Sequence, residues 1–162
     1  MSDLAHEGNY LVAFVPGASG IPNIASPSAA TIITGVDLEA RITPTGLTRD
    51  STTDRKDTTK LNSTFGTQSV GRRNFSLSIT AVREVGDTAG VEAALTYKAF
   101  GFLVIRDHLA ATTAWATGQK CEVYPVQCDN PNKAAPAVNE DQTMVFGFAM
   151  VAEPNLLATT VA

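Results

Sequence analysis

The residue types that carry most enzyme and metal chemistry are sparse in this chain. Its 162 residues include only two histidines, His6 and His108, and neither has another histidine or a cysteine close by. A zinc site needs three or four nitrogen, sulfur or carboxylate ligands at short spacing. The sequence also lacks a nucleophile elbow, a Walker loop and a metalloprotease helix. It therefore predicts no catalytic residues, no metal site and no cofactor.

One pair of acids is the arrangement closest to an active site. Asp37 and Glu39 are two residues apart in an alternating segment, so they fall on the same face of a strand. Paired carboxylates can act as acid and base in a hydrolase, and that is the enzyme reading. The other readings are a solvent-facing row and a row that lines a channel. Because no other catalytic group accompanies the pair, we expect a protein that is not an enzyme.

The two cysteines predict buried thiols and not a disulfide. Cys121 and Cys128 are seven residues apart on or near one expected strand, which points their side chains to opposite faces. A disulfide between them would need a sharp bend in that strand. We expect both thiols to be reduced.

Alternation of apolar and polar residues predicts a mainly β fold. A capping residue at Asp87 or Thr88 and apolar residues at helical spacing predict one helix that ends at Ala99. Strands in this number, with one helix between them, predict a β-sandwich or partly closed barrel with one flanking α-helix and long loops. We expect a single domain over 1–162. The expected strands are residues 10–15, 36–43, 74–83, 101–105, 119–127 and 142–152, with a brief one at 31–34.

A long polar run separates two of the expected strands. From Thr48 to Gly71 only Leu61, Phe65 and Val70 are strongly apolar, and they fit neither the helical nor the strand period. Loops of this length inside a compact domain are uncommon and usually functional or disordered. We expect an irregular polar arm at about 47–72 that reaches another molecule, and a C-terminal tail at about 153–162.

Charge is distributed unevenly along the chain. The formal net charge is −4, which argues against a protein that grips nucleic acid, since that task needs a basic surface. The segment from Arg41 to Arg83 is basic, and the segments on either side are acidic. A bipolar chain can associate with copies of itself, although a solvated loop of mixed charge explains the same pattern. No signal peptide is visible, and no apolar stretch approaches the roughly 20 residues that span a bilayer. We expect a soluble protein made in the cytoplasm, with no membrane contact.

Several segments, taken in order, resemble the siphophage major tail protein, the tail tube subunit common in phages of actinobacteria. The resemblance covers most of the chain, and it includes the charged arm and the closing apolar strand. The segments that carry it are Ile-Ile-Thr-Gly-Val-Asp-Leu (32–38), Ile-Thr-Pro-Thr-Gly-Leu (42–47), Tyr-Lys-Ala-Phe-Gly-Phe-Leu-Val-Ile (97–105), Thr-Gly-Gln-Lys (117–120) and Val-Tyr-Pro-Val (123–126).

The resemblance implies a tail tube fold and a structural role in the virion. In that family six subunits form a ring whose inner strands join into a continuous barrel, and the rings stack into a tube. The tube holds the tape measure protein and later conducts DNA without binding it specifically. The implied partners are other copies of the chain, the tape measure protein, and the tail terminator and distal tail proteins. The implied location is the phage tail, with the host cytoplasm as the place of assembly.

The resemblance and the charge pattern together give two sets of candidate residues. The arm should contact the neighbouring ring, and polar residues on the expected strands should face the lumen. The candidate inter-ring residues are Arg49, Asp50, Asp54, Arg55, Lys56, Asp57 and Lys60, and the candidate lumen-facing residues are Asp37, Glu39, Ser76, Ser78 and Thr80.

Two other structural functions fit the same features. A tube subunit of a type VI or contractile injection system would share the ring but needs an outer sheath. A capsid decoration or head–tail joining protein would share the sandwich but would form closed assemblies.

Overall fold

The computed structural model describes residues 8–18, 20–86, 90–135 and 137–162, and it has the mainly β fold that the alternation predicted. Two short helices, α1 (Ala29–Ile33) and α2 (Val91–Ala94), accompany the strands in the described residues. The strands are β1 (Leu11–Pro16), β2 (Val36–Asp37), β3 (Ile42–Asp57), β4 (Gln68–Val82), β5 (Phe100–Arg106), β6 (Lys120–Cys128), β7 (Asn132–Lys133), β8 (Thr143–Met150) and β9 (Asn155–Thr159).

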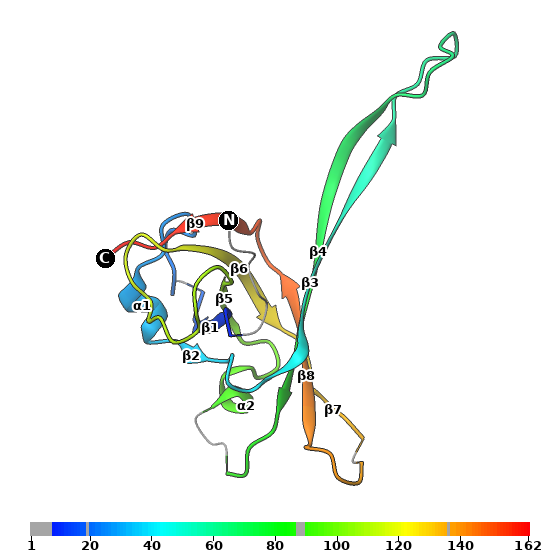
Figure 1. The fold of residues 1–162 in the computed structure, drawn as a ribbon. Coiled ribbons are helices and arrows are strands. Elements are labelled where there is room, and N and C mark those ends of the chain that lie inside the picture. Colours follow the sequence, from blue (N-terminus) through cyan, green and yellow to red (C-terminus); the bar gives the residue numbers. More distant parts are fainter. Residues whose placement is uncertain (1–7, 19, 87–89, 136) are drawn as a thin grey trace.

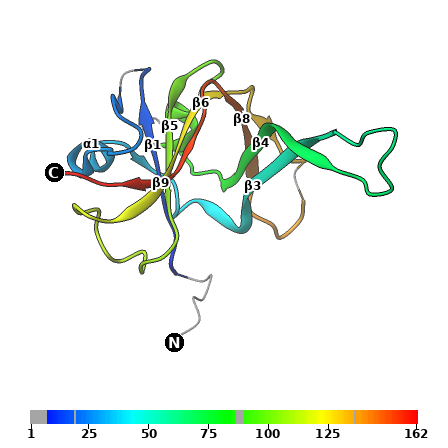
Figure 2. The ribbon, with the colours of Figure 1, turned by 90° about the horizontal axis from the view of Figure 1, so that it is seen from above.

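These strands form one antiparallel sheet that bends over its own core (Figures 1 and 2). The order along it is β2-β1-β5-β6-β8-β4-β3, while β7 pairs with β8 and β9 pairs with β6. The bend brings the β1–β5–β6 part of the sheet opposite the β4–β8 part. The sheet does not close, because β2 and β3 stand at its two ends.

The main core lies between these two parts of the sheet. Phe14, Leu103 and Val126 project into it from one part, and Ile79 and Phe146 project from the other. The alternation expected over 74–83 is confirmed, since Leu77, Ile79 and Ala81 are buried in this core. Apolar burial of this kind is the main favourable term in folding.

A second core covers the other face of β1, β5 and β6. Val15 and Val123 project into it from the strands, and Ile32 of α1, Trp115 and Ala158 of β9 cover them. This explains why the sequence of β1 is apolar at successive positions, since a strand buried on both faces shows no alternation. Cys121 belongs to this second core and Cys128 to the main core, and both are free thiols.

The expected helix ends earlier than predicted, and its predicted N-terminal caps lie outside the described residues. Its proposed caps, Asp87 and Thr88, are not described, and the described helix α2 ends at Ala94 instead of Ala99. Lys98 takes a left-handed conformation (φ 64°) and donates its backbone N–H to the carbonyl of Cys128 at 2.9 Å. Strand pairing with β6 therefore begins before another helical turn can form.

Two short segments also differ from the prediction. The brief strand expected at 31–34 is helix α1, because one helical turn places Ala29 and Ile32 together in buried positions. The expected tail at 153–162 contains β9, which pairs with β6 through Lys120 and Thr159.

The long polar run is an extended β-hairpin and not the irregular loop that we expected (Figure 1). β3 and β4 pair from Leu47–Ile79 out to Asp57–Gln68. We call residues 50–74 the arm, and all of them are exposed. Because neither face of the arm is covered by the rest of the chain, its strands carry no apolar alternation. Their sequence therefore does not show the strand period.

Candidate assembly interface

The described residues show little that could support catalysis. They contain no group of three or more histidine, cysteine or acidic residues placed to hold a metal ion. Asp37 is exposed on β2, and one carboxylate oxygen of Glu39 accepts the backbone N–H of Val12 at 3.4 Å. Partial burial raises the pKa of Glu39, and the negative charge of Asp37 adds to that shift. Glu39 is therefore partly buried, whereas Asp37 lies at the surface.

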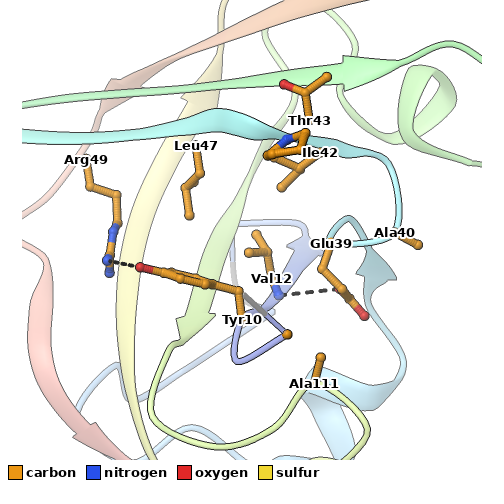
Figure 3. A pocket seen from close by; sticks show the side chains of 11 residues that line it. Tyr10, Val12, Glu39, Ala40, Ile42, Thr43, Leu47, Arg49 and Ala111 are labelled. Atoms are coloured by element: carbon orange, nitrogen blue, oxygen red, sulfur yellow. Dashed lines mark hydrogen bonds between the residues drawn. The ribbon is translucent and has the colours of Figure 1, made fainter. Parts of the chain in front are cut away.

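Glu39 lies in a pocket of about 620 Å³ at the open seam between β1 and β3 (Figure 3). Its walls are mostly apolar, and Val12, Ile42 and Leu47 form much of them. The polar groups at its rim are Glu39, Tyr10, Thr43 and Arg49. Here the part of β1 that lies beyond its short pairing with β2 faces β3, and the two strands do not pair in the described residues.

Arg49 is held at the root of the arm by residues from three other segments. Its guanidinium donates to Glu122 of β6 at 2.7 Å and to Asp107 at 3.2 Å. It also donates to the hydroxyl of Tyr10 at 3.2 Å (Figure 3). Glu122 also accepts the hydroxyl of Tyr124 at 2.8 Å. No pattern in the sequence predicts this cluster, because its members are far apart in the chain and belong to no motif. Arg49 thus fastens the arm to the body of its own chain, and its inter-ring role stays a prediction.

The other predicted arm residues project away from the body. Asp50, Asp54, Arg55, Lys56 and Asp57 lie on β3, where eight residues at about 3.3 Å each extend roughly 25 Å. In the described part of the chain, Arg55, Lys56 and Lys60 form no ion pair. Hydrogen bonds from Thr59 lower the pKa of Asp57. The arm therefore offers charges that its own chain leaves unpaired.

The tip of the arm has a defined conformation and carries exposed apolar side chains. Thr58 donates its N–H to the carbonyl of Thr67 at 2.9 Å, and Thr67 donates its N–H to the hydroxyl of Thr59 at 3.0 Å. Leu61 is fully exposed and Phe65 is 75% exposed. The tip therefore presents two large apolar side chains that its own chain leaves uncovered.

A bulge in the arm explains one of its glycines. The register shifts between Thr53 and Arg55, where β4 carries an extra residue. At this point a Cβ on Gly71 would lie 3.0 Å from the carbonyl oxygen of Asp54. The close approach of the two strands therefore favours glycine.

The structure brings three of the predicted lumen residues together. Ser76, Ser78 and Thr80 alternate with core residues on β4, so they share the outer face of the sheet. Ser78 lies between Thr48 of β3 and Gly147 of β8. The result is a polar face rich in hydroxyl groups.

Asp37 and Glu39 lie elsewhere. Asp37 pairs with Ala13, whose side chain is in the second core, so Asp37 is on the outer face of the opposite part of the sheet. Glu39 is in the pocket at the seam. Neither acid joins the hydroxyl row of β4.

The structure combines an open antiparallel sheet, a projecting charged hairpin and no cluster of catalytic groups in its described residues. In the same described part, no helix is long and apolar enough to cross a membrane. No curated protein sequence matches the chain significantly. A family model described as phage tail tube protein matches residues 1–162, the entire chain. The chain therefore belongs to the phage tail tube protein family, and it is a structural component of the virion tail.

Proposed function

We propose that six copies of this chain form a ring, that the rings stack into a tube, and that DNA passes through the tube during ejection. The tape measure protein fills the tube before ejection, and the tail terminator and distal tail proteins close its ends. Assembly takes place in the host cytoplasm. The observation that carries the proposal is the arm, a charged hairpin that projects from a tail tube protein without any cover from its own body.

The physics of an exposed hairpin supports a partner for the arm. Two-stranded hairpins are at best marginally stable in water, and unpaired strand edges bind other strands. In the described residues, β3 has no neighbour on its outer edge, and β4 between 68 and 76 pairs only with β3. Contact with the neighbouring ring would bury Leu61 and Phe65 and pair Arg55, Lys56 and Lys60 with acidic groups.

The hydroxyl face of β4 suits the wall of a channel for DNA. A wall that binds phosphate would stall the passage of DNA, whereas a neutral or weakly acidic wall would not. Ser76, Ser78 and Thr80 of β4 are uncharged. Asp50 of β3 pairs with Ser76 and adds a negative charge to this face. We propose that this face lines the lumen. The lumen-facing roles of Asp37 and Glu39 stay predictions, and their positions lend them no support.

Electron microscopy of purified protein at low and moderate salt tests the assembly. Hollow tubes or stacked rings are expected. Closed shells would refute the tube and favour a capsid decoration or head–tail joining protein.

A charge variant tests the role of the arm. Changing Arg55, Lys56 and Lys60 together to serine should abolish the tubes and leave the far-UV circular dichroism and melting temperature unchanged. The matched control removes three positive charges from the body instead, by Lys98→Asn, Lys120→Ser and Lys133→Ser, and should assemble normally. Tubes of normal length and number from the arm variant would contradict the proposed contact.

A further inference from the structure

A groove of about 800 Å³ lies at the root of the arm. Arg72, Arg73, Asn74 and Phe75 of β4 form one wall, and the turn between β8 and β9 forms the other. Figure 1 shows this turn facing the lower part of the arm. The groove is distinct from the pocket at the seam, which lies between β1 and β3.

The groove presents both a positive charge and apolar surface. Arg73 pairs with Glu153 and lies over the ring of Phe75, with 6.0 Å between its guanidinium carbon and the ring centroid. Arg72 is exposed, and among the described residues it has no ion-pair partner. Val151, on the opposite wall, is 49% exposed. A ligand for this groove should therefore combine a carboxylate with an apolar side chain.

The loop between β7 and β8 has that combination. Val138 is 89% exposed, and Glu140 and Asp141 follow it on the surface. Asn139, between them, takes a left-handed conformation (φ 64°) that turns the chain. Neither acid forms an ion pair with another described residue. We call residues 137–141 the acidic loop.

The groove and the acidic loop lie at opposite ends of one strand. The acidic loop precedes β8, and the groove wall at Met150–Pro154 follows it. Eight residues of β8, at about 3.4 Å each, separate the two surfaces by roughly 25 Å. Figure 1 shows the acidic loop at the end of the body away from the arm. Copies that associate head to tail need two different complementary surfaces placed in this way.

We propose that the groove receives the acidic loop of a second copy of this chain. Arg72 pairs with Glu140 or Asp141 of that copy, and Val138 packs against Phe75 and Val151. The inference rests on the proposed stacking of copies and goes beyond it, because it names a second contact, separate from the tip of the arm. It also sets the direction of stacking. The acidic loop of the second copy lies at the root of the first copy's arm, and that arm runs alongside the second copy.

Directed disulfide formation tests this contact. The native thiols are buried, so they add little background. In concentrated protein, Ala152→Cys combined with Val138→Cys should give a ladder of disulfide-linked multimers after mild oxidation. Either change alone should give at most dimers, since one surface cysteine cannot link a chain at both ends. A double variant that stays monomeric or dimeric would overturn the inference.

Charge reversal gives a second test. Arg72→Glu should reduce the sedimentable tube fraction by about tenfold or more, since like charges that face each other across an interface are strongly disfavoured. Glu140→Arg with Asp141→Arg should do the same, and all three changes in one chain should restore the tubes. Normal tubes from each reversed variant would overturn the groove contact and leave the proposed tube intact. Closed shells from the unmodified protein would refute the tube, and the disulfide ladder would still report on the groove.

Discussion

The cluster that holds Arg49 should make a measurable contribution to stability, which Arg49→Met would reveal. The guanidinium makes charged hydrogen bonds to Glu122 and Asp107 and a third bond to Tyr10. Hydrogen bonds to charged groups contribute about 1.5–3 kcal/mol each when buried. The side chains of Arg49 and Glu122 are 22% and 25% exposed, and that of Asp107 is 37% exposed. Solvent screening therefore reduces the total.

From these contacts we expect Arg49→Met to lower the free energy of unfolding by about 2 kcal/mol. Methionine keeps most of the packing of the arginine stem, so the loss reports mainly on the ion pairs. For a domain of this size, the melting temperature should fall by about 4–8 °C. Urea unfolding followed by circular dichroism and by Trp115 fluorescence gives the free energy of unfolding, and thermal unfolding followed by circular dichroism gives the melting temperature.

The matched control is Arg55→Met, which removes the same charge from an exposed position on the same strand. Surface substitutions of this kind usually change stability by less than about 0.5 kcal/mol. Equal stability losses in the two variants would refute the reasoning, because they would mean that the contacts of Arg49 add nothing.

Other perturbations test other parts of the structure. Arg106 is buried and donates to the carbonyls of Ala110 and Thr113 at 2.9 and 2.6 Å, so Arg106→Met should destabilise the fold by about 3 kcal/mol in urea unfolding, since it leaves buried acceptors unpaired. Burial raises the pKa of Glu39 above its ordinary value, so the folded state binds its proton more tightly and stability falls as pH rises through the folded pKa. Glu39→Gln should therefore raise the melting temperature at pH 7, and the gain should vanish in acid below the unfolded pKa. Burial raises the pKa of both Cys121 and Cys128 to about 11, so Ellman's reagent should not react with the folded protein and should react with both thiols in urea.

The sequence predicted the strands best where one of their faces is buried. β4 shows the expected alternation because Leu77 and Ile79 enter the core while Ser76 and Ser78 do not. The arm has no such asymmetry, so a hairpin with both faces in solvent resembled a loop. The threonine-rich composition of the arm favours strands, and this composition is the feature of the sequence that indicates a hairpin there.

Residues whose role depends on distant partners could not be assigned from the sequence. Arg106 is one example: carbonyl groups of the 107–119 segment accept its hydrogen bonds, and its guanidinium carbon lies 5.1 Å from the centroid of Trp115. In the sequence, Arg49 cannot be distinguished from the other cations of the polar run, whereas in the structure it forms an ion pair with Glu122. Only the fold separates a cation that fastens the arm from one that remains available to a partner.

The position of the charges along the arm bears on how premature association is avoided. A long exposed hairpin with free edges is a ready template for aggregation, and charged side chains on such edges oppose it. Arg55, Lys56 and Asp57 are exposed on one strand, and Arg72 and Arg73 are exposed on the other. The arm as a whole carries five cations and three acids, a net charge of +2, so two arms that meet repel through their net charge, whereas an arm and the acidic end of another copy attract. The charge pattern thus disfavours arm-to-arm pairing and favours head-to-tail contact, which is the arrangement that a growing tube requires.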